Sequence, residues 1–124
     1  NFAPLDISES ALAVIRRGMS AVLYGVAGTA NSFKLSKKYG GMAGKTGTVQ
    51  VKRITLAQRE KGITQNIDRP WADRDHALFV GYAPLKNPRY AISVVVEHGG
   101  SGSSTATPVA RDILAKTIVE RGLL

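Results

Sequence analysis

Apolar residues recur at every third or fourth position near the start of the chain, over Ser8–Tyr24. This spacing places them along one stripe of an α-helix, so the segment is predicted to be a helix with one buried face. Ser8, or Asp6 together with Glu9, can cap the helix at its start, and Gly25 ends it. The expected buried stripe consists of Leu12, Ile15, Met19 and Val22.

Three further segments have the composition of β-strands. Thr46–Val51 alternates and is rich in threonine and valine, whereas His76–Ala83 and Arg89–His98 are apolar runs. Five residues with proline at both ends, Pro84–Pro88, join the last two strands as a hairpin turn. The polar and basic segment Thr29–Tyr39 is expected to be a loop.

A second helix is predicted over Thr107–Arg121. Thr107 is the expected N-cap, Pro108 takes the first helical position, and Gly122 follows the last turn. The segment before it, Gly99–Ser104, contains only glycine and serine and is expected to be a connecting loop rather than a phosphate-binding loop, because it lacks the Gly-Lys-Ser/Thr ending. The expected apolar face of the helix consists of Val109, Ile113, Leu114 and Ile118.

These elements predict a fold of the α/β (α+β) class: a three-stranded antiparallel meander flanked by N- and C-terminal helices, with both helices on one face. At 124 residues the chain suits one domain, residues 1–124, rather than two. Residues 52–74 are charged and without periodicity, and we expect a flexible insert there. An open edge of such a sheet could accept an extended peptide as an additional strand.

The composition narrows the functional classes. Apolar residues make up 44% of the chain, which is typical of a folded domain, and no apolar run approaches the roughly 18 to 20 residues of a membrane span. The absence of cysteine excludes disulfides, thiolate nucleophiles and cysteine metal sites. The sequence therefore predicts a folded domain whose chemistry depends on other residue types.

The net charge of +8 is concentrated in residues 1–62, which hold ten basic and three acidic residues. A positive surface favours anionic partners, and one alternative function is a small basic nucleic-acid-binding module. Aromatic residues are sparse at 6%, and only Phe33 and Tyr39 lie near the basic cluster of this region. A platform for stacking bases is thus poorly supplied. That cluster consists of Lys34, Lys37 and Lys38.

The most informative motif is Lys45-Thr46-Gly47, followed by Thr48 at the start of the first predicted strand. Lys-Thr-Gly is one of three motifs of β-lactamases and penicillin-binding proteins, beside Ser-x-x-Lys and Ser-Asp-Asn. Four glycines precede or interrupt this strand, which suggests that another molecule's backbone lies close against it. They are Gly40, Gly41, Gly44 and Gly47.

Nearly the whole chain resembles the C-terminal part of the transpeptidase domain of class B penicillin-binding proteins, in particular those of the cell-elongation machinery. Five blocks match in the same order, which is far more specific than one tripeptide. They are Gly18-Met19 with Gly28-Thr29-Ala30, Ala43–Gln50, Asp75–Pro84, Tyr90–Gly100 and Ala106–Leu114.

The resemblance implies a role for each residue of the motif. Lys45, Thr46 and Thr48 would hold the carboxylate of a D-alanyl-D-alanine stem peptide or of a β-lactam by charge-assisted hydrogen bonds. Gly47 would keep the groove open for substrate. The backbone N–H of Thr48 would be one of two oxyanion-hole donors and so contribute to catalysis.

The nucleophile is missing from this sequence. No serine is followed three residues later by lysine, since Ser32 precedes Leu35 and Ser36 precedes Tyr39 at that spacing. No serine is followed two residues later by asparagine. Because the chain also begins at Asn1, without an initiator methionine, we expect a fragment whose catalytic serine lies upstream and which is inactive alone.

By the same resemblance, the expected partners are a stem peptide or β-lactam, the upstream half of the domain, a membrane glycosyltransferase and shape-determining proteins, with no nucleic acid. The expected location is the periplasmic face of the inner membrane, with the anchor outside this chain. A β-lactam-sensing or β-lactamase-like domain is a further alternative. Neither a cofactor nor a metal is expected: His76 and His98 could be read as ligands, but zinc sites usually gather three or four.

Overall fold

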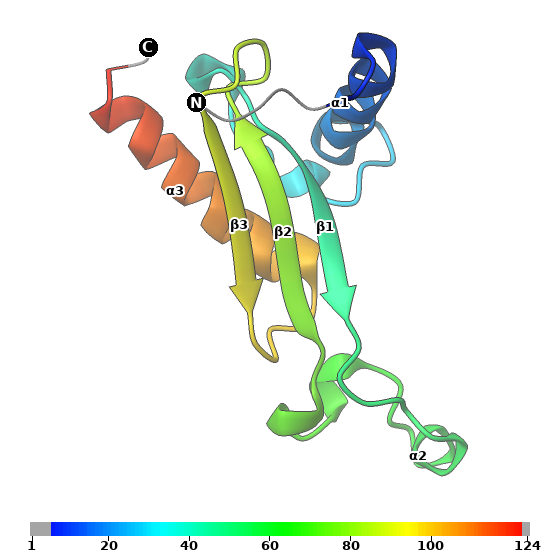
Figure 1. Cartoon of the computed structure of the whole chain (residues 1–124). Coiled ribbons are helices and arrows are strands. Elements are labelled where there is room, and N and C mark those ends of the chain that lie inside the picture. Colours follow the sequence, from blue (N-terminus) through cyan, green and yellow to red (C-terminus); the bar gives the residue numbers. More distant parts are fainter. Residues whose placement is uncertain (1–5, 123–124) are drawn as a thin grey trace.

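A three-stranded antiparallel sheet forms the centre of the molecule (Figure 1). The structure is a computed structural model that describes residues 6–122; the predicted fragment start at Asn1 lies outside them. The strands β1 (Ala43–Val49), β2 (His76–Ala83) and β3 (Tyr90–Val96) lie in the order of the sequence. The predicted meander is confirmed, and β2 has the predicted bounds.

The first strand lies earlier in the sequence than its composition indicated. It spans Ala43–Val49 rather than Thr46–Val51, because Val51 already leaves the sheet and donates its N–H to a carboxylate oxygen of Asp75 at 3.3 Å. The third strand is also shorter than the predicted Arg89–His98. At its end His98 has a positive φ of 54°, which turns the chain away from the strand direction.

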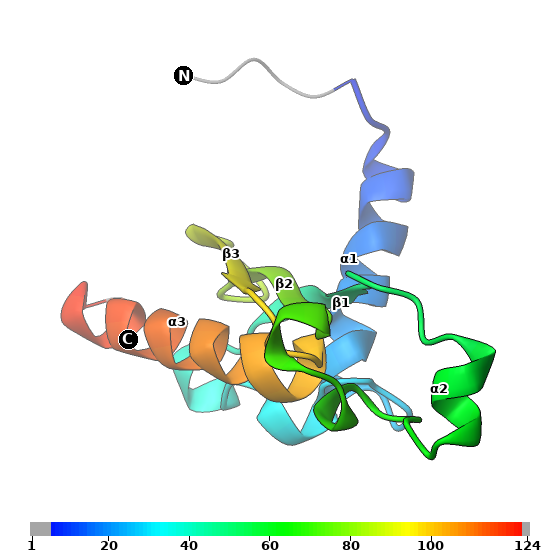
Figure 2. The same ribbon diagram turned by 90° about the horizontal axis from the view of Figure 1, so that it is seen from below.

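Helix α1 (Glu9–Tyr24) begins as predicted, with the Ser8 hydroxyl accepting the Ala11 N–H, and Gly25 is its C-cap. The C-terminal part of the helix contacts β1 rather than lying beside the C-terminal helix on one face, and its first turns project away from the sheet (Figure 2). Its buried face therefore differs from the predicted stripe. Ile15 is 50% exposed, whereas Leu23, near the end of the helix, is fully buried.

Helix α3 (Thr107–Glu120) covers one face of the sheet through β2 and β3 (Figures 1 and 2). Thr107 is not its N-cap as predicted: a π-helical turn, Gly102–Ala106, precedes it, and the Thr107 hydroxyl donates to the Gly102 carbonyl at 2.9 Å. Its buried face also differs from the prediction, because Val109 and Ile113 point outward. The residues that face the sheet are Ala110, Leu114 and Ile118.

The hydrophobic core lies between α3, the C-terminal end of α1 and one face of the sheet. Phe79 of β2 is fully buried at its centre. A Cβ on Gly44 would collide with the Phe79 ring and lie 2.5 Å from the Val80 carbonyl oxygen. Burying this ring contributes about 2 to 3 kcal/mol, so the ring and the glycine beside it fix β1 against β2.

The glycines before the motif have structural explanations that differ from the predicted one. Gly40 and Gly41 adopt φ values of 80° and 68°, which residues with a side chain rarely adopt. Gly44 provides room for Phe79. Of the four glycines, only Gly47 remains a candidate for close approach by another molecule.

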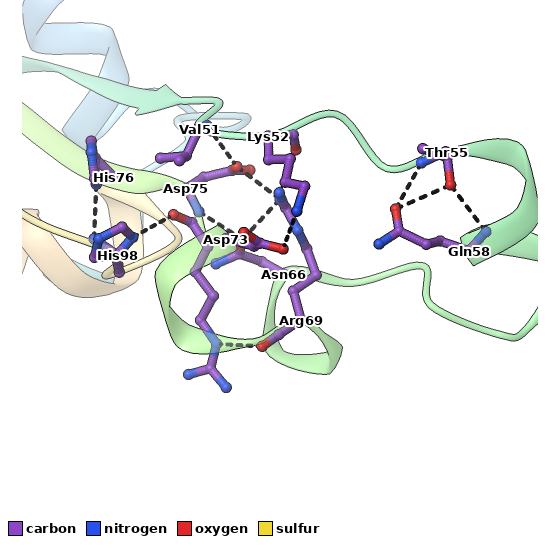
Figure 3. A network of polar contacts seen from close by, with 11 residues as sticks. Val51, Lys52, Thr55, Gln58, Asn66, Arg69, Asp73, Asp75, His76 and His98 are labelled. Atoms are coloured by element: carbon purple, nitrogen blue, oxygen red, sulfur yellow. Dashed lines mark hydrogen bonds and ion pairs between the residues drawn. The ribbon is translucent and has the colours of Figure 1, made fainter.

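Residues 52–74 extend beyond one end of the sheet and contain the short helix α2 (Leu56–Glu60), whose N-terminus is capped by the Thr55–Gln58 capping box (Figures 1 and 3). Two 3₁₀ turns follow, Asn66–Asp68 and Trp71–Asp73. The predicted insert thus has local helical structure, while its flexibility stays a prediction. Within residues 6–122, no helix is long and apolar enough to cross a bilayer.

Arg69 ties this insert to the end of the sheet (Figure 3). Its guanidinium pairs with Asp75 at 2.9 Å and donates to the Lys52 carbonyl oxygen. The N–H of Asp75 in turn donates to the side-chain oxygen of Asn66 at 2.9 Å. One buried arginine of the insert therefore binds Lys52, at the start of the insert, and Asp75, just after its end.

Candidate substrate-binding strand

The Lys-Thr-Gly motif lies on β1, an edge strand of the sheet. The register pairs Lys45 with Val80, Thr46 with Phe79 and Gly47 with Leu78 on β2. Among the described residues, no strand pairs with the outer edge of β1. Backbone groups at such an edge can bond an added chain, which is the geometry that recognition of an extended peptide requires.

Lys45 is exposed and lies on the sheet face opposite α3. It shares that face with its partner Val80, which is also exposed, whereas the next residue on β2, Phe79, points into the core. The Lys45 ammonium donates to the Thr46 carbonyl oxygen at 2.6 Å. The positive charge thus remains beside the motif and within reach of an anionic ligand.

Thr46 contacts the loop that follows α1. Its hydroxyl lies 3.2 Å from the Thr29 hydroxyl. The sequence placed Thr29 in a loop before the strand, but no spacing pattern connects it with Thr46, so this contact was missed. The structure therefore adds a second hydroxyl beside the motif.

Gly47 and Thr48 complete the motif. A Cβ on Gly47 would lie 3.3 Å from the Leu78 side chain, which is a tight contact. Beneath it, Gly102 packs so closely against the Gly47 and Leu78 carbonyl oxygens that a side chain there would collide. Thr48 is exposed and pairs with Ala77. The π-helical turn before α3 thus supports the strand from the core side.

A cavity of about 350 Å³ lies between α1 and the motif. Lys45 and Thr29 line it, together with small residues at the end of α1 and in the following loop. Larger side chains there would fill the space, whereas glycine and alanine leave room beside the ammonium group. The motif therefore adjoins an open cavity with one cationic and one hydroxyl group at its wall.

Tyr24, at the end of α1, fixes the segment that leads into β1. Its phenol donates to the Leu35 carbonyl oxygen at 2.6 Å and accepts the Met42 N–H at 3.1 Å. Burial raises the pKa of Tyr24, and the hydrogen bond from Met42 opposes that shift. The phenol remains neutral at physiological pH and joins the end of α1 to the residue before β1.

His76 and His98 lie together at the far end of the sheet, with ring centroids 4.7 Å apart. The His98 N–H donates to Nδ1 of His76 at 2.9 Å, and Nδ1 of His98 contacts the Arg74 carbonyl oxygen at 2.9 Å. The Trp71 ring packs against His98 in a tilted arrangement, with ring centroids 4.3 Å apart. These rings have structural partners at the base of the insert, and residues 6–122 contain no group of three or more potential metal-binding side chains.

The sequence profile described as the penicillin-binding protein transpeptidase domain matches residues 3–115. The chain belongs to the penicillin-binding protein transpeptidase family. Membership of this family explains why the sheet, the helices and the Lys-Thr-Gly strand occur together in this chain.

Individual relatives support the assignment to this family. The chain is 37% identical over 99 residues to the peptidoglycan D,D-transpeptidase MrdA of Haemophilus influenzae, which covers 80% of this chain and 14% of the relative. It is 36% identical over 96 residues to MrdA of Escherichia coli K12, covering 74% and 14%. The chain therefore spans about one seventh of the curated relatives that it matches.

Solved structures give the same assignment. Penicillin-binding protein 2 (PBP2) of Pseudomonas aeruginosa, in complex with WCK 5153, aligns with a TM-score of 0.62 and 32% identity over 94% of this chain and 20% of that one. Helicobacter pylori PBP2, in complex with MreC, aligns with a TM-score of 0.68 and 27% identity over 100% and 21%. The chain is a fragment of a PBP2-type transpeptidase domain, and the comparisons do not support the nucleic-acid-binding alternative.

Proposed function

We propose that this chain supplies the substrate-binding half of the active site of a peptidoglycan D,D-transpeptidase, as the C-terminal part, residues 1–124, of a single transpeptidase domain. The observation that carries the proposal is the motif on the open edge of β1, with the Lys45 ammonium exposed beside it. The relatives named peptidoglycan D,D-transpeptidases support it. A β-lactam-sensing or β-lactamase-like activity has no comparable support.

The proposed chemistry is serine acyl transfer. A serine of the upstream half attacks the carbonyl carbon of the D-alanyl-D-alanine bond, D-alanine leaves, and the acyl group passes to the amine of a second stem peptide. Lys45, Thr46 and Thr48 bind the terminal carboxylate, and Gly47 leaves room for the substrate backbone. The Thr48 N–H donates to the oxygen on which negative charge develops, where removal of one such donor typically costs about a hundredfold to a thousandfold in rate.

The uncovered face of the sheet supports a split site. Val80 and Val95 are exposed on the same face as Lys45, and Ile15 is exposed on the part of α1 that projects beyond the sheet. Apolar residues grouped in this way mark a surface that another layer covers. We propose that the upstream half packs on this face and brings its serine next to Lys45.

The relatives support a proposal for the location and the larger partners. A solved complex joins PBP2 and MreC of Helicobacter pylori. We propose that the parent of this chain acts at the periplasmic face of the inner membrane, held by an anchor outside this sequence. There it would work with shape-determining proteins and a membrane glycosyltransferase.

The test is acylation of the full-length parent by a labelled penicillin. Lys45→Ala should lower the second-order acylation rate by about tenfold to a hundredfold, because it removes a charge-assisted hydrogen bond to the carboxylate. Lys38→Ala removes an exposed basic residue that does not belong to the motif and whose ammonium lies 4.7 Å from the centroid of the Tyr39 ring, and it serves as the matched control. Equal rates for Lys45→Ala and wild type would remove Lys45 from the site.

Mass spectrometry tests the split site directly. Penicillin is added to this chain alone and to a mixture with the upstream half of its parent, and intact masses are measured. We expect an adduct on the upstream half and none on this chain. An adduct on this chain would mean that it contains a nucleophile, and the half-site proposal would be wrong.

A further inference from the structure

Thr29 and Thr46 bring two hydroxyl groups together from segments far apart in the sequence. The oxygen atoms lie 3.2 Å apart, and either hydroxyl can donate. Thr29 belongs to the loop after α1, whereas Thr46 is the central residue of the motif on β1. The contact therefore depends on how that loop is held against the strand.

The loop is fixed on both sides of Thr29. The Ala30 N–H donates to the Val22 carbonyl oxygen at 3.0 Å, and Ala30 is buried in the core. The Asn31 side chain donates to the Gly25 carbonyl oxygen at 3.0 Å. Gly28 lies so close to the helix end that a Cβ there would be 2.5 Å from the Val22 carbonyl oxygen. The loop thus folds back on α1, and Thr29 is presented toward the strand by a constrained backbone.

Such an anchored hydroxyl can set the direction of its neighbour's O–H group. A threonine hydroxyl has one proton and two acceptor positions, and its torsion is otherwise free. When Thr29 donates to Thr46, the Thr46 proton is left for a different acceptor, and the bond that it makes is strengthened by the one that it accepts. Thr29 and Lys45 line the same cavity, so an anionic group bound there would lie next to the pair of hydroxyls.

We propose that Thr29 is a positioning residue for the carboxylate-binding hydroxyl of Thr46. The inference rests on the proposed function, since it assigns to the ligand a carboxylate held by Lys45 and Thr46. Thr29 acts through Thr46. It orients the Thr46 O–H toward the carboxylate, so this hydroxyl loses less rotational entropy when ligand binds.

The experiment uses the full-length parent and measures the second-order rate of acylation by a labelled penicillin. Thr29→Val keeps the shape and removes the hydroxyl, and we expect the rate to fall about three- to tenfold, the effect of one net hydrogen bond. Thr29→Ser restores the hydroxyl and should recover most of the rate. Ser32→Ala removes an exposed hydroxyl from the same loop and should leave the rate unchanged.

A double-substitution cycle separates positioning from a general effect on the loop. If Thr29 acts through Thr46, then Thr29→Val should change the rate less than twofold when Thr46 is already valine. An equal loss in both backgrounds, or a wild-type rate for Thr29→Val, overturns the inference. Lys45→Ala in the same assay distinguishes the two proposals, because a full rate in that variant counts against the proposed function itself.

Discussion

Arg69 offers a direct test of how the insert is attached to the sheet. Its side chain is only 4% exposed, and that of its partner Asp75 is 19% exposed. We expect Arg69→Met to expose residues 52–74 to local unfolding. The reason is that the substitution removes the Arg69 guanidinium, which donates to the Asp75 carboxylate and to the Lys52 carbonyl oxygen.

The magnitude follows from the burial of the two partners. Removal of one member of a buried ion pair costs about 3 to 5 kcal/mol, because the other charge stays uncompensated. Asp75 is partly accessible and keeps the Val51 N–H, so water and this donor offset part of the loss. We therefore expect about 3 kcal/mol, at the lower end of that range.

A second ion pair at the base of the same insert provides the control. Lys52 and Asp73 pair at 2.8 Å, but the Lys52 side chain is 59% exposed. An exposed pair contributes about 0 to 1 kcal/mol, so Lys52→Met should have little effect. The Lys52 backbone carbonyl oxygen that Arg69 contacts is unchanged by this substitution.

The assay is limited proteolysis together with hydrogen exchange of residues 52–74. Arg69→Met should raise the local opening equilibrium by roughly a hundredfold, which is what about 3 kcal/mol corresponds to at 25 °C. Lys52→Met should remain within a few-fold of wild type. Equal protection of the insert in wild type and Arg69→Met would refute the conclusion that this buried pair holds the insert in place.

Two further predictions concern the core and the approach to the motif. Gly44→Ala should lower the free energy of unfolding by on the order of 3 kcal/mol, because its Cβ would collide with Phe79 and Val80; thermal unfolding checks this, and Gly18→Ala, with nothing within 4 Å, should not be destabilising. Full recovery in the double variant Gly44→Ala/Phe79→Leu would contradict the role of the backbone oxygen. Burial raises the pKa of Tyr24, so the unfolded chain loses this proton first, near pH 10, and the stability contributed by the neutral phenol falls as pH rises further. Tyr24→Phe should reduce this alkaline loss in urea unfolding from pH 8 to 11, at a cost of about 1 to 2 kcal/mol at neutral pH from two unpaired backbone groups, and an unchanged alkaline slope would count against it.

The local features of the sequence determined the elements and their order. The bounds of His76–Ala83 followed from an apolar run between polar segments, and the start of α1 followed from Ser8 before a periodic segment. These signals are local, because strand propensity and helix capping depend on residues within a few positions. The Lys-Thr-Gly motif and its neighbouring blocks also sufficed to identify the family, because they recur in a fixed order.

Tertiary structure decided which side chains each element buries. Periodicity marked Ile15 and Ile113 as apolar-face residues, but both are half-exposed. Ile15 lies on a helix whose first turns project beyond the sheet, and Ile113 lies on the outward side of α3. Thr107 has the sequence features of an N-cap, but a π-helical turn precedes it, so Thr107 is not the first residue of the helical segment. Its hydroxyl donates to the Gly102 carbonyl oxygen of that turn. A periodic pattern shows that residues share a face, and only packing decides what covers that face.

The sequence also did not predict the long-range contacts around the candidate site. The Thr29–Thr46 contact joins residues 17 positions apart, and the Arg69–Asp75 pair closes a segment that has no periodic pattern. Such contacts depend on strand register and on how loops fold back, which are set by the whole core at once. The sequence by itself identified the Lys-Thr-Gly motif, whereas the tertiary structure decided which groups hold that motif in place, because long-range contacts form only when the sheet has assembled.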